Sequence, residues 1–152
     1  MAQGANAIED LRPFVGEWSL EALFPGAPPT DDRGRVSFEW MTGGRFLVQR
    51  WEVPPPEAPD GLAVIGFDEG RNTLLQHYFD SRGVARVYEM RFGDGVWELS
   101  RTTEDFSPLS FWQRFSGTFS DDGKTIRGRW EISHDAGSTW EHDLDLIYTK
   151  VA

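Results

Sequence analysis

The sequence contains no cysteine, and this absence excludes several kinds of chemistry at once. Disulfides, thiolate metal sites and a cysteine nucleophile are all ruled out. No apolar run approaches the roughly 20 residues that a membrane-spanning helix needs. Residues 1–14 lack both a basic start and an apolar stretch, so they show no secretory signal. Together these absences predict a cytoplasmic protein with no membrane partner.

Basic residues are also scarce, with 15 Lys and Arg against 25 Asp and Glu and a formal net charge of −10. Such a charge repels phosphate backbones and anionic lipid head groups, so we expect no nucleic-acid partner. Aromatic residues, in contrast, make up 14% of the chain and include 7 Trp and 11 Phe. So many large rings predict a wide interior that they fill or line.

The length of 152 residues fits one domain, which we place at residues 7–152 after a disordered start at residues 1–6. Asn6 is typical of a helix N-cap. Apolar residues then recur at helical spacing, at Ile8, Leu11 and Phe14. This pattern predicts one short N-terminal helix, which we expect Pro13 to end.

From Val15 onwards the apolar pattern has a period of two, and turn signals recur about every ten residues. The pattern predicts ten strands, over residues 17–24, 35–41, 46–53, 62–68, 73–80, 84–92, 96–102, 110–119, 124–133 and 139–151. Their connections are too short for crossover helices, so sequential strands should pair antiparallel. Closure of the sheet removes both bare edges and encloses space. We therefore predict an all-β fold, an antiparallel up-and-down barrel of about ten strands with one short N-terminal helix.

Polar residues on otherwise apolar faces are the candidates for contact with a ligand. Strict alternation in the last strand places Trp140 and His142 inward with Leu144, Leu146 and Tyr148. A buried polar group needs a partner, a water or a ligand, and an internal hydrogen-bonded network would satisfy it equally. The facing of residues 46–53 and 73–80 stays open, because both of their faces carry rings and polar groups. The predicted ligand-binding residues are Trp18, Trp40, His77, Arg86, Tyr88, Arg101, Gln113, Phe115, Trp130 and His142.

Two further motifs bear on function. Residues 133–140 resemble the Asp-box hairpin of sialidase-type propellers, in which the box is structural. We expect Asp135 to accept hydrogen bonds from turn amides and Gly137 to take a positive φ. Without a repeat of blade length, the motif indicates a hairpin and no sialidase activity. The three histidines lie on separate elements without a metal-binding spacing, so we expect no metal site.

Four segments of the chain carry a family resemblance, at residues 14–18, 38–46, 77–84 and 140–143. Together they resemble a bacterial family of calycin-like (lipocalin-like) β-barrels, and the resemblance runs from about residue 8 to the C-terminus. The function of that family is not known, so the resemblance implies the barrel fold and no reaction.

A more distant similarity is carried by residues 16–18, Gly-Glu-Trp, and by a histidine on the final strand. These features are similar to nitrobindin-type haem barrels, although the first strand lacks the Gly-rich continuation of that family. The similarity implies a haem whose iron is bound by His142 in a cavity that accepts nitric oxide.

Four hypotheses about function follow. The leading one is a binding protein for a small, partly apolar molecule inside the barrel, with no cofactor and no catalytic residue assigned. The second is haem binding through His142. The third is an enzyme, an isomerase or hydrolase with His142 or His77 as its base, which the sequence favours less. The fourth is an interaction domain with a solid barrel, and a homodimer stays an open alternative.

Overall fold

The computed structural model describes residues 7–28, 32–54 and 59–152. Its strands agree with the predicted ones to within one or two residues at each end. Within these described residues, no helix is long and apolar enough to cross a membrane. The strands are β1 (Gly16–Leu23), β2 (Gly34–Trp40), β3 (Leu47–Glu52), β4 (Gly61–Asp68), β5 (Thr73–Asp80), β6 (Ala85–Gly93), β7 (Val96–Arg101), β8 (Trp112–Phe119), β9 (Thr125–Ser133) and β10 (Glu141–Lys150).

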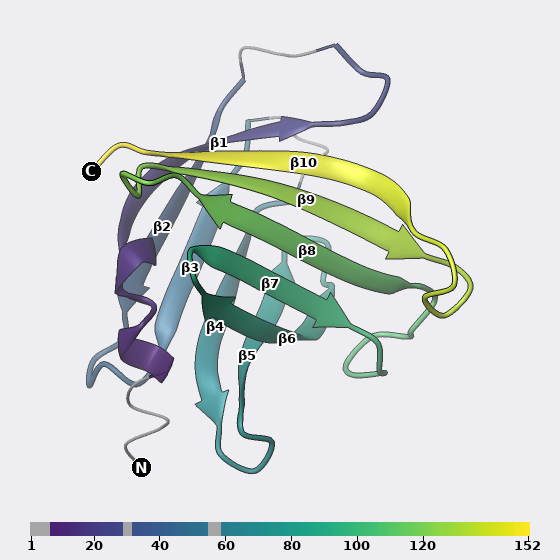
Figure 1. The fold of residues 1–152 in the computed structure, drawn as a ribbon, viewed down its shortest axis with the longest axis horizontal. Helices are drawn as coiled ribbons and strands as arrows, with labels where there is room; N and C mark the ends of the chain where they lie inside the picture. Colours follow the sequence, from purple (N-terminus) through teal and green to yellow (C-terminus); the bar gives the residue numbers. More distant parts are fainter. Residues whose placement is uncertain (1–6, 29–31, 55–58) are drawn as a thin grey trace.

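The ten strands form one closed antiparallel barrel in which each strand pairs with its neighbours in sequence (Figure 1). The barrel closes where β1 pairs with β10, with Leu20 opposite Tyr148. On its other side β1 pairs with β2, with Trp18 opposite Val36. The predicted all-β, up-and-down barrel is therefore confirmed. Closure gives every strand two partners, so no edge is left for pairing with another chain.

The N-terminal segment covers one end of the barrel (Figure 1). Residues 7–9 are helical, and a 3-10 turn, η1 (Arg12–Phe14), leads into β1. The short N-terminal helix is thus confirmed, but the prediction that Pro13 ends it is wrong. Pro13 lies in the first turn of η1, where its missing N–H costs no hydrogen bond. The predicted cap Asn6 and the predicted disorder of residues 1–6 lie outside the described residues.

Phe14 closes this end of the barrel with its ring. Its side chain is fully buried, and its ring centroid lies between 4.9 and 5.2 Å from four other rings. The four rings belong to Phe38, Phe92, Trp97 and Phe119. Trp18 adds a fixed link, because its indole N–H donates to the Phe14 carbonyl at 2.8 Å. These five rings and Trp18 therefore form a solid core at one end of the barrel.

The hairpin between β9 and β10 has the local geometry expected of an Asp-box. The Asp135 carboxylate accepts hydrogen bonds from the Thr139 amide at 2.8 Å and from the Ser133 hydroxyl at 2.8 Å. Gly137 has a φ of 90°, a region in which glycine has no steric penalty. Trp140 packs on the outer surface, where the Arg114 guanidinium lies 4.0 Å from its ring, so the prediction that it faces inward is wrong. The motif therefore shapes a turn and leaves the barrel interior untouched.

Candidate functional site

The barrel is hollow at the end opposite Phe14. A cavity of about 450 Å³ lies there, within the range of pockets that hold small molecules. Inward-facing residues of the strands form its wall, and residues of the loops at that end form its mouth. Aromatic rings make up much of the wall, from Phe24, Trp51, Tyr78, Tyr88, Trp97, Phe111, Phe115, Trp130 and Tyr148. Trp97 touches both the Phe14 ring and this cavity, so its indole forms the floor.

Several rings of the wall contact one another in sequence around the barrel. Trp51 stacks on Tyr78 with centroids 5.4 Å apart and an angle of 29° between the planes. Tyr78 meets Tyr88 edge to face at 6.0 Å, and Tyr88 meets Trp130 at 5.4 Å. Such contacts hold the rings in fixed orientations. The wall is therefore an ordered aromatic surface onto which a flat molecule can stack.

The register of β5 settles the facing of the two strands that the sequence left open. Gln76 lies opposite Ile65 and Tyr88, so it points into the barrel, as does Gln49 on β3. His77 alternates with Gln76 and lies opposite Val64 and Val87 on the outer face. The cavity therefore receives two glutamines that the sequence did not single out, and His77 is not among its lining residues.

A β-bulge in β10 overturns the inward facing predicted for His142. The pairing with β9 shifts between His142, opposite Glu131, and Leu144, opposite Trp130, which leaves Asp143 as an extra residue. Such an insertion breaks the strict alternation of faces. His142 consequently lies on the outer face, where its Nε2 is 2.8 Å from Asp145 Oδ1. Asp143 takes its place at the cavity, and burial raises the pKa of its carboxyl.

The predicted site residues divide into two groups. Five of them line the cavity: Arg86, Tyr88, Gln113, Phe115 and Trp130. The other five do not: Trp18, Trp40, His77, Arg101 and His142. Trp18 and Trp40 pack with the core at the closed end, which a facing pattern alone cannot distinguish from the hollow end.

Arg101 points inward as predicted, yet its partners are all in the protein. It is 2% exposed, and its guanidinium donates to the Asp105 carboxylate through Nε and Nη2, each at 2.8 Å. Further bonds reach the carbonyls of Ser107 and Pro108 in the loop after β7. The pKa of Asp105 lies well below its ordinary value, chiefly because Arg101 donates to it. Arg101 therefore anchors this loop to the barrel, as the internal-network alternative expected.

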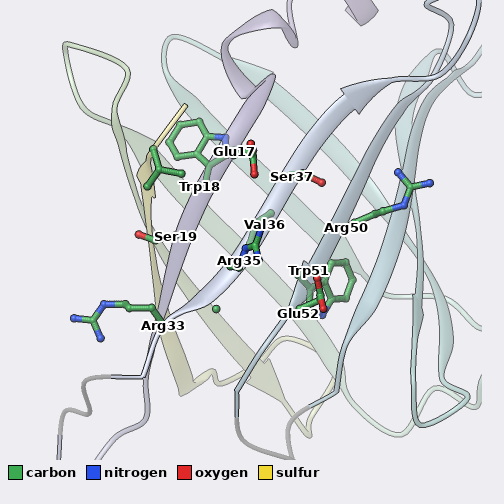
Figure 2. A pocket seen from close by; sticks show the side chains of 12 residues that line it. Glu17, Trp18, Ser19, Arg33, Arg35, Val36, Ser37, Arg50, Trp51 and Glu52 are labelled. Atoms are coloured by element: carbon green, nitrogen blue, oxygen red, sulfur yellow. The ribbon is translucent and has the colours of Figure 1, made fainter.

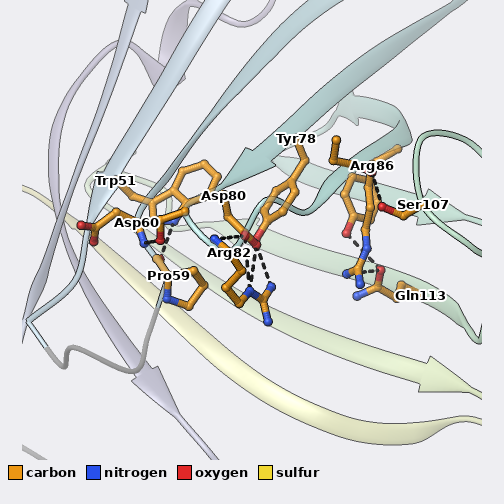
Figure 3. A network of polar contacts seen from close by, with 12 residues as sticks. Trp51, Pro59, Asp60, Tyr78, Asp80, Arg82, Arg86, Ser107 and Gln113 are labelled. Atoms are coloured by element: carbon orange, nitrogen blue, oxygen red, sulfur yellow. Dashed lines mark hydrogen bonds and ion pairs between the residues drawn. The ribbon is translucent and has the colours of Figure 1, made fainter.

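Arg82 is a second guanidinium at this end, and it also has a carboxylate partner (Figure 3). Its Nη2 lies 2.7 Å from Asp80 Oδ2, and the Tyr78 hydroxyl donates to the same oxygen at 2.6 Å. Burial alone would raise the pKa of Asp80, but these hydrogen bonds hold it below its ordinary value. For Tyr78, burial and the neighbouring carboxylate both raise the pKa. The three side chains form a neutralised cluster at the mouth.

Arg86 differs from both, because its hydrogen bond goes to a neutral group (Figure 3). Its Nη1 donates to Gln113 Oε1 at 3.3 Å, and the Tyr88 hydroxyl donates to the same oxygen at 3.0 Å. The guanidinium also lies 5.7 Å from the Phe111 ring. Among the described residues, no carboxylate forms an ion pair with Arg86.

Four buried side-chain atoms in the described part of the chain have no hydrogen-bond partner, and all four belong to residues that line this cavity. They are Gln49 Oε1, Gln76 Oε1, Arg86 Nε and Trp97 Nε1. An unsatisfied buried polar atom costs about 1–3 kcal/mol. Residues of the cavity wall thus carry buried polar atoms that the protein leaves unsatisfied, at a stability cost.

A second hollow of about 310 Å³ lies against β1, β2 and β3 (Figure 2). Its lining mixes charges of both signs, with Arg33, Arg35 and Arg50 near Glu17 and Glu52. None of the four unpartnered atoms described above belongs to a residue that lines this second hollow. The barrel cavity is therefore the stronger candidate site.

The cavity does not fit the haem site that the similarity to nitrobindins implies. The described residues of its lining include no histidine or methionine, and His142 lies on the outer face. Among the described residues, no group of three or more His, Asp or Glu is placed to hold a metal ion.

Comparison with known proteins supports the fold and goes no further. No family model matches the chain, and no curated protein matches it significantly. Among solved structures, the crystal structure of Rv2717c from M. tuberculosis is similar, with a TM-score of 0.65 and 16% sequence identity. The alignment covers 96% of this chain and 98% of that one. At this identity the similarity concerns the fold alone, which in this chain is a closed antiparallel barrel of ten strands.

Proposed function

We propose that this protein binds a small, partly apolar molecule in the barrel cavity. The observation that carries the proposal is the concentration of unpartnered polar atoms at the cavity, on Gln49, Gln76, Arg86 and Trp97. A barrel that served only as a solid scaffold would gain stability from apolar residues at these positions. The aromatic wall supplies apolar contact area, and the polar side chains of Gln49 and Gln76 line the same cavity.

The first test is made on freshly purified protein, by native mass spectrometry and absorption spectroscopy. A co-purified small molecule would support the proposal and identify the ligand. A Soret band that His142→Ala abolishes would contradict it in favour of haem. A second test uses the neutral fluorescent probe N-phenylnaphthylamine, whose flat rings match the wall.

Two variants with substitutions on β10 test whether the probe binds inside the cavity. Replacing both Leu144 and Leu146 by Trp adds two indoles to the cavity, because both residues line it. The control Ile147→Trp adds an indole to the outer face, where Ile147 lies opposite Arg127. We expect the double variant to weaken probe binding by about tenfold or more and the control to leave it unchanged. Absence of both a co-purified mass and probe binding would contradict the proposal.

A further inference from the structure

Three arginines lie at the open end of the barrel, and their different partners indicate the charge of the ligand. Arg82 is paired with Asp80 and Arg101 with Asp105. Arg86 lines the cavity and is half-buried, and its hydrogen bond is made to the neutral Gln113 amide. Removing a charged group from water is costly unless an opposite charge compensates it. The protein therefore supplies counter-charges for two of the three guanidiniums and leaves the third without one in the described residues.

The hydrogen-bond inventory of Arg86 supports the same conclusion. A guanidinium has five N–H donors in a planar fork that suits the two oxygens of an oxyanion. Here Nη1 donates to Gln113 and the buried Nε has no partner. The Gln113 oxygen already accepts from the Tyr88 hydroxyl, so it cannot satisfy Arg86 further. The Arg86 Nη2 group makes no hydrogen bond within the described residues, and Arg86 lines the cavity, so this donor is free to bind a ligand.

The surroundings of Arg86 indicate what kind of anion would fit. The Phe111 ring lies 5.7 Å from the guanidinium, and the rings of Tyr88 and Trp130 continue the wall from there. An oxyanion held by Arg86 would place the rest of its molecule against these aromatic faces. Flat ring systems pack on such walls by offset stacking or edge-to-face contact.

Arg82, which is paired with Asp80, and Asp143 are the other charged residues of the described lining, and neither forms an ion pair with Arg86. Asp143 lines the mouth, and the causes that act on the pKa of its carboxyl are burial, which raises it, and the charge of His142.

We propose that the ligand is a flat, aromatic organic anion whose oxyanion group binds the Arg86 guanidinium. This inference rests on the proposed function, since it assigns a chemical class to the occupant of the same cavity. The carboxylate or sulfonate oxygens accept from the terminal Nη groups of Arg86, and the ring system lies against the wall between Phe111 and Trp130.

The test compares two probes that share one aromatic body and differ in charge. Anilinonaphthalene sulfonate carries the anion, and N-phenylnaphthylamine lacks it. Charge-assisted hydrogen bonds are strong enough that Arg86→Gln should weaken binding of the sulfonate about 10- to 100-fold. Its binding of the neutral probe should change less than about twofold, within the error of such comparisons. Arg86→Lys, which keeps the charge, should recover part of the lost affinity.

Arg91→Gln is the matched control, because it removes the same charge from an exposed position on the same strand. It should leave both affinities unchanged. If wild type binds both probes and Arg86→Gln changes neither, or weakens both equally, the anion proposal is overturned and the binding function stands. If wild type binds neither probe and no small molecule co-purifies with it, both proposals are overturned. Thermal unfolding of each variant confirms that the comparison is made on folded protein.

Discussion

The buried ion pair between Arg101 and Asp105 is expected to be one of the costliest contacts to break in this protein. The side chains are 1% and 8% exposed, and the carboxylate accepts two bonds from Arg101. It also accepts from the backbone amides of Val87 at 2.7 Å and Ser107 at 3.0 Å. Asp105→Asn removes the negative charge and turns an amide group toward these donors. Because this substitution leaves the buried Arg101 guanidinium without a counter-charge, we expect a loss of about 3–5 kcal/mol in the free energy of unfolding.

For a chain of this length, such a loss lowers Tm by roughly 6–20 °C. Urea unfolding at neutral pH measures the free energy directly. The control is Glu131→Gln, which breaks a 2.8 Å contact to Arg114 at the surface and should cost about 1 kcal/mol or less. A cost for Asp105→Asn as small as that of the control would refute the argument. Changing the pair together to Met and Leu should recover much of the loss, because no unpaired charge remains.

The pH dependence gives a second check on the same pair. The pKa of Asp105 is lowered in the folded state, chiefly by the hydrogen bonds from Arg101, relative to the ordinary value of 3.8. Its contribution is therefore fully present above about pH 4 and declines as the pH falls toward the folded-state pKa. The stability difference between wild type and Asp105→Asn should narrow in acid. A difference that stays constant from pH 6 down to acid unfolding would contradict this origin.

Three further predictions concern packing and titration. Phe14→Ala should cost about 3–5 kcal/mol in urea unfolding, since the ring is fully buried among four others; a cost below 1 kcal/mol would contradict its role in closing the barrel. Gly128→Ala should lower the free energy of unfolding by about 1–3 kcal/mol, because the new Cβ meets the Phe115 ring. In the control Gly93→Ala the new Cβ meets nothing within 4 Å, so the free energy of unfolding should change by about 0.5 kcal/mol or less. Equal effects of the two substitutions would contradict the close packing at Gly128. Burial raises the pKa of all three tyrosines above 10.0. Absorbance at alkaline pH should therefore show no tyrosinate step near pH 10 in the folded protein, and the free energy of unfolding should fall as the pH rises above that value. A tyrosinate step near pH 10 in the folded protein would contradict the burial of these side chains.

The strands and the barrel could be predicted because period-two patterns and turn residues act locally. Short connections then restrict the topology to sequential antiparallel pairing, and closure follows from the cost of bare edges. The floor and wall of the cavity were partly predictable in the same way, since Phe115 and Trp130 follow regular alternation. Trp18 obeys the same rule yet belongs to the solid end, because alternation states the face of a residue and not its depth along the barrel.

The role of each polar residue depended on contacts that no local pattern contains. Arg86 and Arg101 both sit on inward faces, and only a carboxylate in the loop after β7 separates a structural guanidinium from an available one. Gln49 and Gln76 lie on strands whose two faces look alike in sequence, so only the register with neighbouring strands assigns them. His142 was misplaced because a single bulge, which no residue type announces, changes the facing of everything before it.

That bulge has a consequence for how the sequence can vary in length. Asp143 has no partner on β9, so a chain without this residue could pair with β9 along the whole strand. Inserting or deleting a residue in a regular barrel strand moves the following side chains from the inner face to the outer face and the reverse. Deleting Asp143 would instead leave the other residues of β10 on their present faces. Position 143 is therefore a point where one codon can be gained or lost, adding or removing a carboxylate at the entrance without rebuilding the wall.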